Sequence, residues 1–81
     1  MADLGIIALR KGDYAGAETL FRQSLEGQYT HPELHNLLGV ALESQGDLEG
    51  AAAEYLKALE LFEGFKIASD NLARVREKKQ K

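Results

Sequence analysis

The chain has 81 residues and a mass of 8.9 kDa, enough for one small domain with one hydrophobic core. Hydrophobic residues make up 44% and charged residues 28%, as in ordinary globular proteins, and no apolar run approaches the roughly 18 residues of a membrane-spanning helix. The chain contains no cysteine, which excludes disulfides, thiolate nucleophiles and cysteine-ligated metals. Because the start, Met1-Ala2-Asp3-Leu4, does not resemble a secretory signal, we expect a cytoplasmic protein.

The charges are unevenly distributed along the chain. Residues 1–65 contain four Lys or Arg against eleven Asp or Glu, a net charge of −7, whereas residues 66–81 contain six against two, a net charge of +4. Cations near the end of a helix interact favourably with its dipole, so we interpret the basic segment as the end of the last helix. A basic arm that binds nucleic acid is an alternative, although no aromatic residue is interleaved with the basic ones.

Apolar periodicity and turn residues predict five helices, near residues 2–11, 14–27, 32–45, 48–62 and 65–79. Gly12-Asp13 separates the first two, and Gly46-Asp47 separates the third and fourth. In each dipeptide the glycine can adopt the left-handed conformation past a helix end, and the aspartate can accept hydrogen bonds from the first N–H groups of the next helix. The connection at residues 27–31 leads to Pro32, which suits a first helical turn. The apolar stripes predict a core of Leu4, Ala8, Ala17, Phe21, Leu25, Leu38, Leu42, Ala51, Tyr55 and Leu59.

The sequence repeats itself with a 34-residue period. Leu4-Gly5 recurs as Leu38-Gly39, and Gly12-Asp13 recurs as Gly46-Asp47. Further matches are Gly16-Ala17 with Gly50-Ala51, Leu25-Glu26 with Leu59-Glu60, and Phe21 with Tyr55. One more period leads from Leu38 to Leu72, so the chain contains two copies and the first half of a third.

This 34-residue helix-turn-helix, with Leu-Gly in its first helix and Ala-x-x-x-Phe/Tyr in its second, resembles the tetratricopeptide repeat. The second copy, from Gln45-Gly46-Asp47 through Tyr55 to Leu61, is close to the family consensus. The resemblance implies an all-α fold, an α-solenoid of antiparallel helix pairs. It further implies a single domain over residues 1–81, with a first repeat at 1–31 that is incomplete at its start, a second at 32–65 and a capping helix at 66–81.

The chain offers no set of residues with the ordering of an active site. His31 and His35 are four residues apart and could present two nitrogens to a metal, but no third histidine or cysteine exists. We find no phosphate-binding glycine loop and no Ser/His/Asp set with an ordering signal. We therefore expect no catalytic residue, no metal site and no cofactor, and we do not expect an enzyme.

The resemblance implies a concave groove lined by the first helix of each repeat, which takes a peptide or helix of a partner protein. It places in that groove Ile6, Leu9, Glu33, Asn36, Leu37, Val40, Glu43, Ile67, Asp70, Asn71 and Arg74. The floor of this groove is apolar, and Glu33, Glu43, Asp70 and Arg74 form a polar rim.

The sequence supports three hypotheses about function. The first is a protein-interaction module whose groove binds an apolar or amphipathic segment of a protein partner, without membrane or nucleic-acid contacts. The second is a structural or self-associating repeat fragment of a larger scaffold, in which Ile6, Leu37 and Val40 pack on neighbouring repeats, and copies associate through an N-terminal end that leaves Leu4, Ile7, Tyr14 and Leu20 uncovered. The third is a nucleic-acid adaptor that uses the basic last helix.

Overall fold

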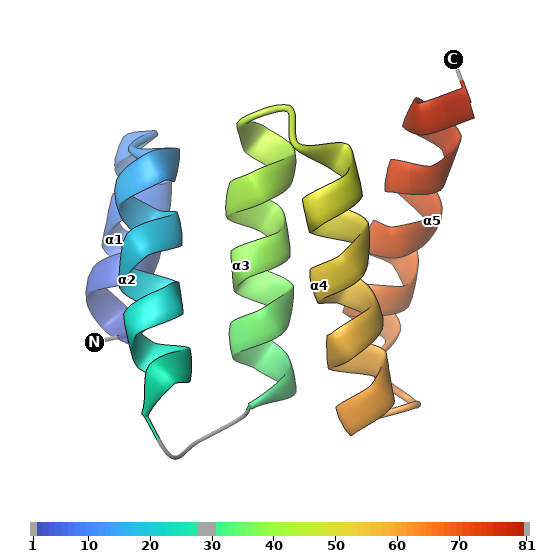
Figure 1. Cartoon of the computed structure of the whole chain (residues 1–81), viewed down its shortest axis with the longest axis horizontal. Helices are drawn as coiled ribbons and strands as arrows, with labels where there is room; N and C mark the ends of the chain where they lie inside the picture. The colour runs from blue at the N-terminus through green and yellow to red at the C-terminus, as the bar shows by residue number, and fades with distance from the viewer. Residues whose placement is uncertain (1, 28–30, 81) are drawn as a thin grey trace.

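The computed structural model describes residues 2–27 and 31–80, and these form five α-helices (Figure 1). They are α1 (Ala2–Lys11), α2 (Tyr14–Glu26), α3 (Pro32–Ser44), α4 (Leu48–Leu61) and α5 (Lys66–Gln80). The predicted helix ends differ from these by no more than one residue. Residues 28–30 of the predicted 27–31 connection lie outside the described residues, as do Met1 and Lys81.

The helices form two antiparallel pairs, α1 with α2 and α3 with α4, and α5 packs on the second pair. In Figure 1, α2 and α4 lie in front of α1 and α5. The all-α fold of repeated helix pairs that the 34-residue period predicts is thereby confirmed.

The two Gly-Asp dipeptides form the turns within the pairs, as expected. Gly12 and Gly46 have φ of 83° and 89°, a left-handed conformation that glycine adopts without a Cβ clash. The Asp13 and Asp47 carboxylates each accept a hydrogen bond from the backbone N–H three residues later, at 3.0 and 2.9 Å. Each dipeptide therefore ends one helix and caps the next.

The core of each pair is built around one aromatic ring. Phe21 on α2 and Tyr55 on α4 are completely buried, and each ring lies against the glycine of the Leu-Gly motif in the preceding helix. A Cβ added at Gly5 would lie 2.5 Å from the Phe21 ring, and one at Gly39 would lie 2.5 Å from the Tyr55 ring. The absence of a side chain at these glycines is what allows the aromatic rings to fit between the paired helices.

The predicted core is largely correct, with one clear exception. Leu4 is 53% exposed, whereas Leu38, its equivalent in the second repeat, is 1% exposed. The difference arises because α2 packs over α3, while no helix among the described residues covers that side of α1. Leu25 and Leu59 are half-buried against the core, and the other predicted core residues are buried.

α5 packs through Ala68, Leu72 and Val75, all of which are buried. Ile67, which a capping helix could also use for packing, is 60% exposed and contributes little to it. Some positions on α5 that are equivalent to buried residues of α3 carry exposed side chains; Arg76, for example, corresponds to Leu42. α5 therefore combines one apolar face with a polar outer face.

Candidate functional site

The candidate site is the surface formed by α1, α3 and α5, which we call the first-helix face. All the predicted groove residues belong to these three helices. Ile6 and Leu9 on α1, and Leu37 and Val40 on α3, are partly buried and pack against the core cluster. Each of the four contributes to the core and still leaves part of its side chain accessible, so together they give α1 and α3 an apolar surface.

The remaining groove positions are polar or lie at the edge of the face. Glu33 is exposed, and Ile67 and Asp70 are exposed near the start of α5. The Asp70 carboxylate lies 3.7 Å from the Lys66 ammonium in a solvent-exposed ion pair. Exposed pairs of this kind contribute little to stability, so these side chains are available for other contacts.

Asn36 and Asn71 are only 6% and 9% exposed, and they bind each other. The Asn71 Nδ2 group donates to Asn36 Oδ1 at 2.9 Å, joining α5 to α3. A buried amide without a partner is costly, so this contact specifies how the two helices are aligned. The amides of Asn36 and Asn71 thus serve the contact between helices, and their predicted place in a partner-binding groove stays a prediction.

Glu43 connects three helices. Its carboxylate accepts hydrogen bonds from the Tyr55 hydroxyl on α4 at 2.8 Å, from Arg74 Nε and Nη2 on α5 at 2.9 and 2.8 Å, and from Lys78 Nζ at 2.7 Å. The Glu43 side chain is 9% exposed, whereas Arg74 and Lys78 are about half exposed. Two of the basic residues of the last helix are thus bound within the fold.

The charges of this network are fixed at neutral pH. The hydrogen bonds from Arg74, followed by those from Lys78 and Tyr55, lower the pKa of Glu43 to about 2 despite the opposing effect of burial. Burial, together with the nearby Glu43 carboxylate, raises the pKa of the Tyr55 hydroxyl. Contact with Glu43 also raises the pKa of Arg74. The hydroxyl consequently stays protonated and donates, and the carboxylate stays ionised and accepts.

One repeat earlier, the positions equivalent to the residues of this network hold apolar side chains. Between equivalent positions of the repeats, Glu43 corresponds to Leu9, Arg74 to Val40, and Tyr55 to Phe21. A tyrosine hydroxyl is therefore present where a carboxylate can accept from it, and absent where the equivalent position is leucine. The sequence contains this difference between the copies. It is missed when Phe21 and Tyr55 are treated as equivalent aromatic residues, because only Tyr55 has a hydroxyl group. The first-helix face is accordingly apolar over α1 and α3, and charged over α3 and α5.

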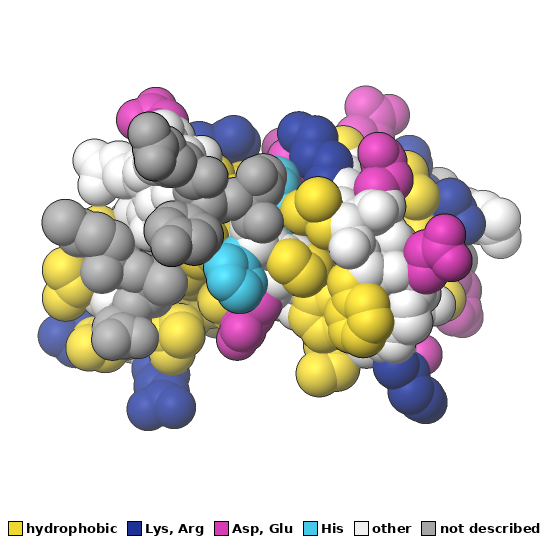
Figure 2. Space-filling model, turned by 90° about the horizontal axis from the view of Figure 1, so that it is seen from below, with side chains coloured by type: hydrophobic (Ala, Val, Ile, Leu, Met, Phe, Trp, Pro, Cys, Tyr) yellow, Lys and Arg dark blue, Asp and Glu magenta, His cyan; other side chains and the backbone are white. Residues whose placement is uncertain are grey.

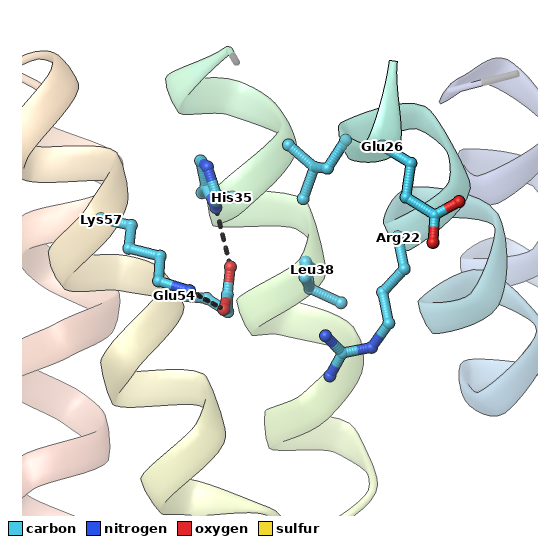
Figure 3. A pocket seen from close by; sticks show the side chains of 7 residues that line it. Arg22, Glu26, His35, Leu38, Glu54 and Lys57 are labelled. Atoms are coloured by element: carbon cyan, nitrogen blue, oxygen red, sulfur yellow. Dashed lines mark hydrogen bonds and ion pairs between the residues drawn. The ribbon is translucent and has the colours of Figure 1, made fainter. Parts of the chain in front are cut away.

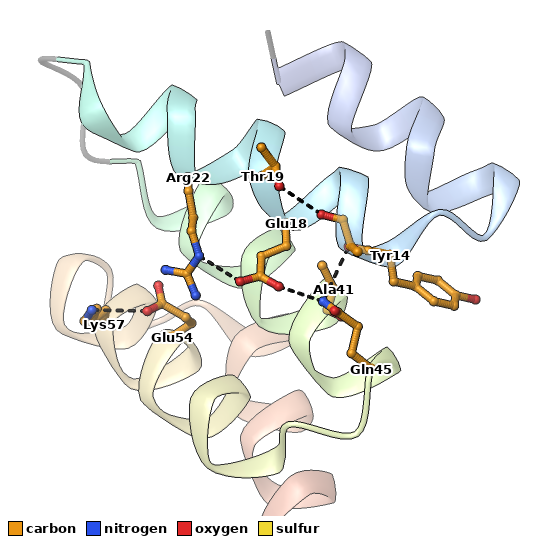
Figure 4. A network of polar contacts seen from close by, with 9 residues as sticks. Tyr14, Glu18, Thr19, Arg22, Ala41, Gln45, Glu54 and Lys57 are labelled. Atoms are coloured by element: carbon orange, nitrogen blue, oxygen red, sulfur yellow. Dashed lines mark hydrogen bonds and ion pairs between the residues drawn. The ribbon is translucent and has the colours of Figure 1, made fainter.

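A second polar network joins α2 to α3 (Figure 4). The Glu18 carboxylate accepts from Gln45 Nε2 at 2.8 Å and from Arg22 Nε at 2.9 Å. These contacts, that with Gln45 first, lower the pKa of Glu18. Gln45 Nε2 also donates to the Ala41 carbonyl oxygen at 3.1 Å, so its amide links the end of α3 to the middle of α2.

A hollow of about 290 Å³ lies between α2, α3 and α4 (Figure 3). At its edge the buried His35 ring donates from Nδ1 to Glu54 Oε1 at 2.7 Å, and Lys57 Nζ donates to Glu54 Oε2 at 3.1 Å. The Arg22 side chain lines the hollow from α2. His35 is thus bound to a carboxylate. Among residues 2–27 and 31–80, no group of three or more His, Cys, Asp or Glu side chains is placed to hold a metal ion.

None of the described helices is long and apolar enough to cross a bilayer. Comparison with known proteins shows that residues 2–64 match the family model for the tetratricopeptide repeat. A TPR repeat-containing protein of Pseudomonas aeruginosa is 44% identical over 69 residues, which is 85% of this chain and 28% of that relative. The chain therefore spans less than a third of the length of this curated relative.

Proposed function

Because the chain belongs to the tetratricopeptide repeat family, we propose that it binds a peptide or helix of a partner protein on the first-helix face. Repeats of this family are generally protein–protein interaction modules, and their proteins are typically non-enzymatic scaffolds. The partner segment lies along the groove formed by the first helices, and the groove residues are those named from the sequence.

The observation that supports this proposal is the apolar surface of Ile6, Leu9, Leu37 and Val40. These four side chains remain partly accessible on α1 and α3, two helices that contact each other. An amphipathic segment would bury its apolar side there, which is how helical grooves recognise partner helices. Beside it, Glu43 holds Arg74 in place, so the guanidinium presents a fixed polar boundary to the segment.

The test begins with peptide selection from a display library on the immobilised chain, followed by calorimetric titration of an enriched peptide. We expect Leu37→Arg to abolish binding while the far-UV circular dichroism stays the same, with a moderate fall in melting temperature because part of the Leu37 side chain packs against the core. Leu56→Arg is the matched control, because Leu56 is 41% exposed on α4, in the other layer of helices. Equal binding by the wild type and Leu37→Arg would contradict the proposed groove, and unfolding of this variant would show that Leu37 is a core residue. Val40→Glu is an independent second variant.

A second candidate is a self-associating fragment of a larger scaffold, favoured by apolar exposure on the first helix pair. Leu4, Ile7 and Tyr14 are 53%, 46% and 38% exposed. Their equivalents one repeat later include Leu38 and Ala41, both of which are buried. Another copy packing on this N-terminal face would bury them similarly. Sedimentation of the wild type against Ile7→Lys tests this candidate, which requires association that the variant loses.

A further inference from the structure

The apolar part of the first-helix face borders on a basic part. Leu37, Val40 and Glu43 follow one another at intervals of three residues on α3, so they lie along the same side of the helix. Glu43 binds Arg74 of α5 through two hydrogen bonds and Lys78 through a third. A segment bound on Leu37 and Val40 would therefore meet these two cations about one helical turn, roughly 5 Å, further along α3.

The Glu43 carboxylate has no accepting capacity left for a partner. Oε1 accepts from the Tyr55 hydroxyl and from Arg74 Nη2, and Oε2 accepts from Arg74 Nε and Lys78 Nζ. These bonds occupy both lone pairs of each oxygen, and the Glu43 side chain is only 9% exposed. This place consequently offers hydrogen-bond donors to a bound segment, and no acceptor.

Unused donors remain on both cations. Within the part of the chain that the structure describes, the Arg74 guanidinium donates from Nε and Nη2 but not from Nη1. The Lys78 ammonium carries three N–H groups and makes one hydrogen bond, to Glu43. Both side chains are about half exposed, so a bound segment can reach them. Because Glu43 already holds them, binding would cost little further side-chain entropy.

Cations outnumber carboxylates where α3 and α5 end. Residues 74–80 contain four Lys or Arg and one acidic residue, Glu77, and Glu43 of α3 adds a second carboxylate. The end of α1 and the two Gly-Asp turns contribute equal numbers of both signs: Arg10, Lys11, Asp13 and Asp47. This end of the first-helix face is therefore positively charged, although residues 1–65 as a whole have a net charge of −7.

Among the described side chains, the opposite end of the face, where α1, α3 and α5 begin, has no surplus of cations. Glu33 is exposed there, and Lys66 is paired with Asp70 at 3.7 Å. Figure 2 shows the molecule from this end, with acidic and basic side chains interspersed among hydrophobic ones. The positive charge thus belongs to one end of the face, next to the apolar surface of α3.

We propose, on the basis of the function proposed above, that the partner is an amphipathic protein segment with a carboxylate side chain beside its apolar run, and that Arg74 and Lys78 bind this carboxylate. A guanidinium and an ammonium held by the same residue provide several donors to one carboxylate, and hydrogen bonds between charged groups are the strong ones. The adjoining apolar surface favours a protein segment over a nucleic acid, which would leave Leu37 and Val40 uncovered.

The probes are peptides enriched from a display library on the wild-type chain. Each is paired with a counterpart in which the Asp or Glu beside the apolar run is replaced by Asn or Gln. We expect enriched peptides to carry an acidic residue within about one turn of the apolar run. In calorimetric titration, the wild type should bind the acidic form roughly fivefold to tenfold more tightly than its amide counterpart.

Matched variants of α5 show whether this preference comes from the two cations. Arg74→Gln and Lys78→Gln should each reduce it. Arg76→Gln and Lys79→Gln remove the same charge from exposed places on the same helix and should preserve it. Lys78→Gln leaves both bonds between Arg74 and Glu43 in place, so it tests the charge without loosening α5, and circular dichroism checks the fold of each variant.

The outcomes separate this proposal from the proposed groove. Equal binding of the acidic and amide peptides, with binding still lost in Leu37→Arg, would overturn the role of the two cations and leave the groove intact. A preference that persists in both Arg74→Gln and Lys78→Gln would overturn it as well. If no peptide binds in a way that depends on Leu37, both proposals fail.

Two further measurements address other occupants of the basic end. Binding of a single-stranded oligonucleotide that Arg74→Gln and Arg76→Gln weaken equally, with no peptide preference, would assign the cations of α5 to nucleic acid and overturn the proposal. A dimer of the peptide-free chain in sedimentation that is lost in Arg74→Gln would overturn it in favour of a second copy.

Discussion

Replacing Glu43 with glutamine tests whether the network between α3, α4 and α5 stabilises the fold. The substitution keeps the shape of the side chain and one oxygen that can accept from Tyr55. It removes the negative charge that pairs with Arg74 at 2.8 Å and Lys78 at 2.7 Å. Because these contacts connect α5 to the rest of the fold, the free energy of unfolding should fall.

The size of the effect follows from the pKa of Glu43. Its decrease from 4.5 to about 2 on folding corresponds to no more than about 4 kcal/mol, at about 1.4 kcal/mol for each pKa unit. Arg74 and Lys78 are 48% and 50% exposed, so solvent screening reduces the expected loss to about 1–2 kcal/mol. Since folding lowers this pKa, the stabilisation is complete above pH 4.5 and is lost as the pH falls towards about 2.

Urea denaturation of the wild type and Glu43→Gln at several pH values between 6 and 2.5 measures this contribution. We expect the difference between the two proteins to be largest at pH 6 and to lose most of its size by pH 2.5. Glu26→Gln, which changes an exposed carboxylate at the end of α2, is the control and should leave stability nearly unchanged. A difference that is absent at pH 6, or that does not shrink in acid, would refute the role assigned to Glu43.

Three further predictions concern the elements of the repeat. Gly39→Ala should destabilise the protein by about 1–3 kcal/mol in thermal denaturation, because the new Cβ would lie 2.5 Å from the Tyr55 ring, even though alanine usually favours helices. An unchanged melting temperature would mean that the ring moves freely. Asp47→Ala should cost about 1 kcal/mol through loss of its 2.9 Å capping bond to Gly50, and urea titration against Asp47→Asn, which retains an acceptor, checks this. Deleting residues 66–81 should cause aggregation or unfolding by exposing the core beneath α5, whereas a monomeric truncated chain with an unchanged midpoint would disprove the capping role.

The sequence by itself determined the helices, their pairing and most of the core. Gly12-Asp13 and Gly46-Asp47 define helix ends through local chemistry, a left-handed glycine followed by a capping carboxylate. The 34-residue period defines the repeating unit, and helical spacing identifies Phe21 as a core residue. These features depend on residues a few positions apart or on exact repetition, so periodicity and turn chemistry reveal them directly.

Only the tertiary structure decided which of the predicted groove residues bind other side chains of the same protein. Asn36 binds Asn71, and Glu43 binds Arg74, across separations of 35 and 31 residues. Such contacts depend on how α5 is stacked on α3, which no local pattern specifies. The exposure of Leu4, which the sequence predicts for an N-terminal end without a preceding helix, depends on stacking in the same way, because the helix that covers its equivalent, Leu38, belongs to the neighbouring repeat. Burial in a solenoid is a property of stacked neighbours, and the same motif is therefore core in one copy and surface in another.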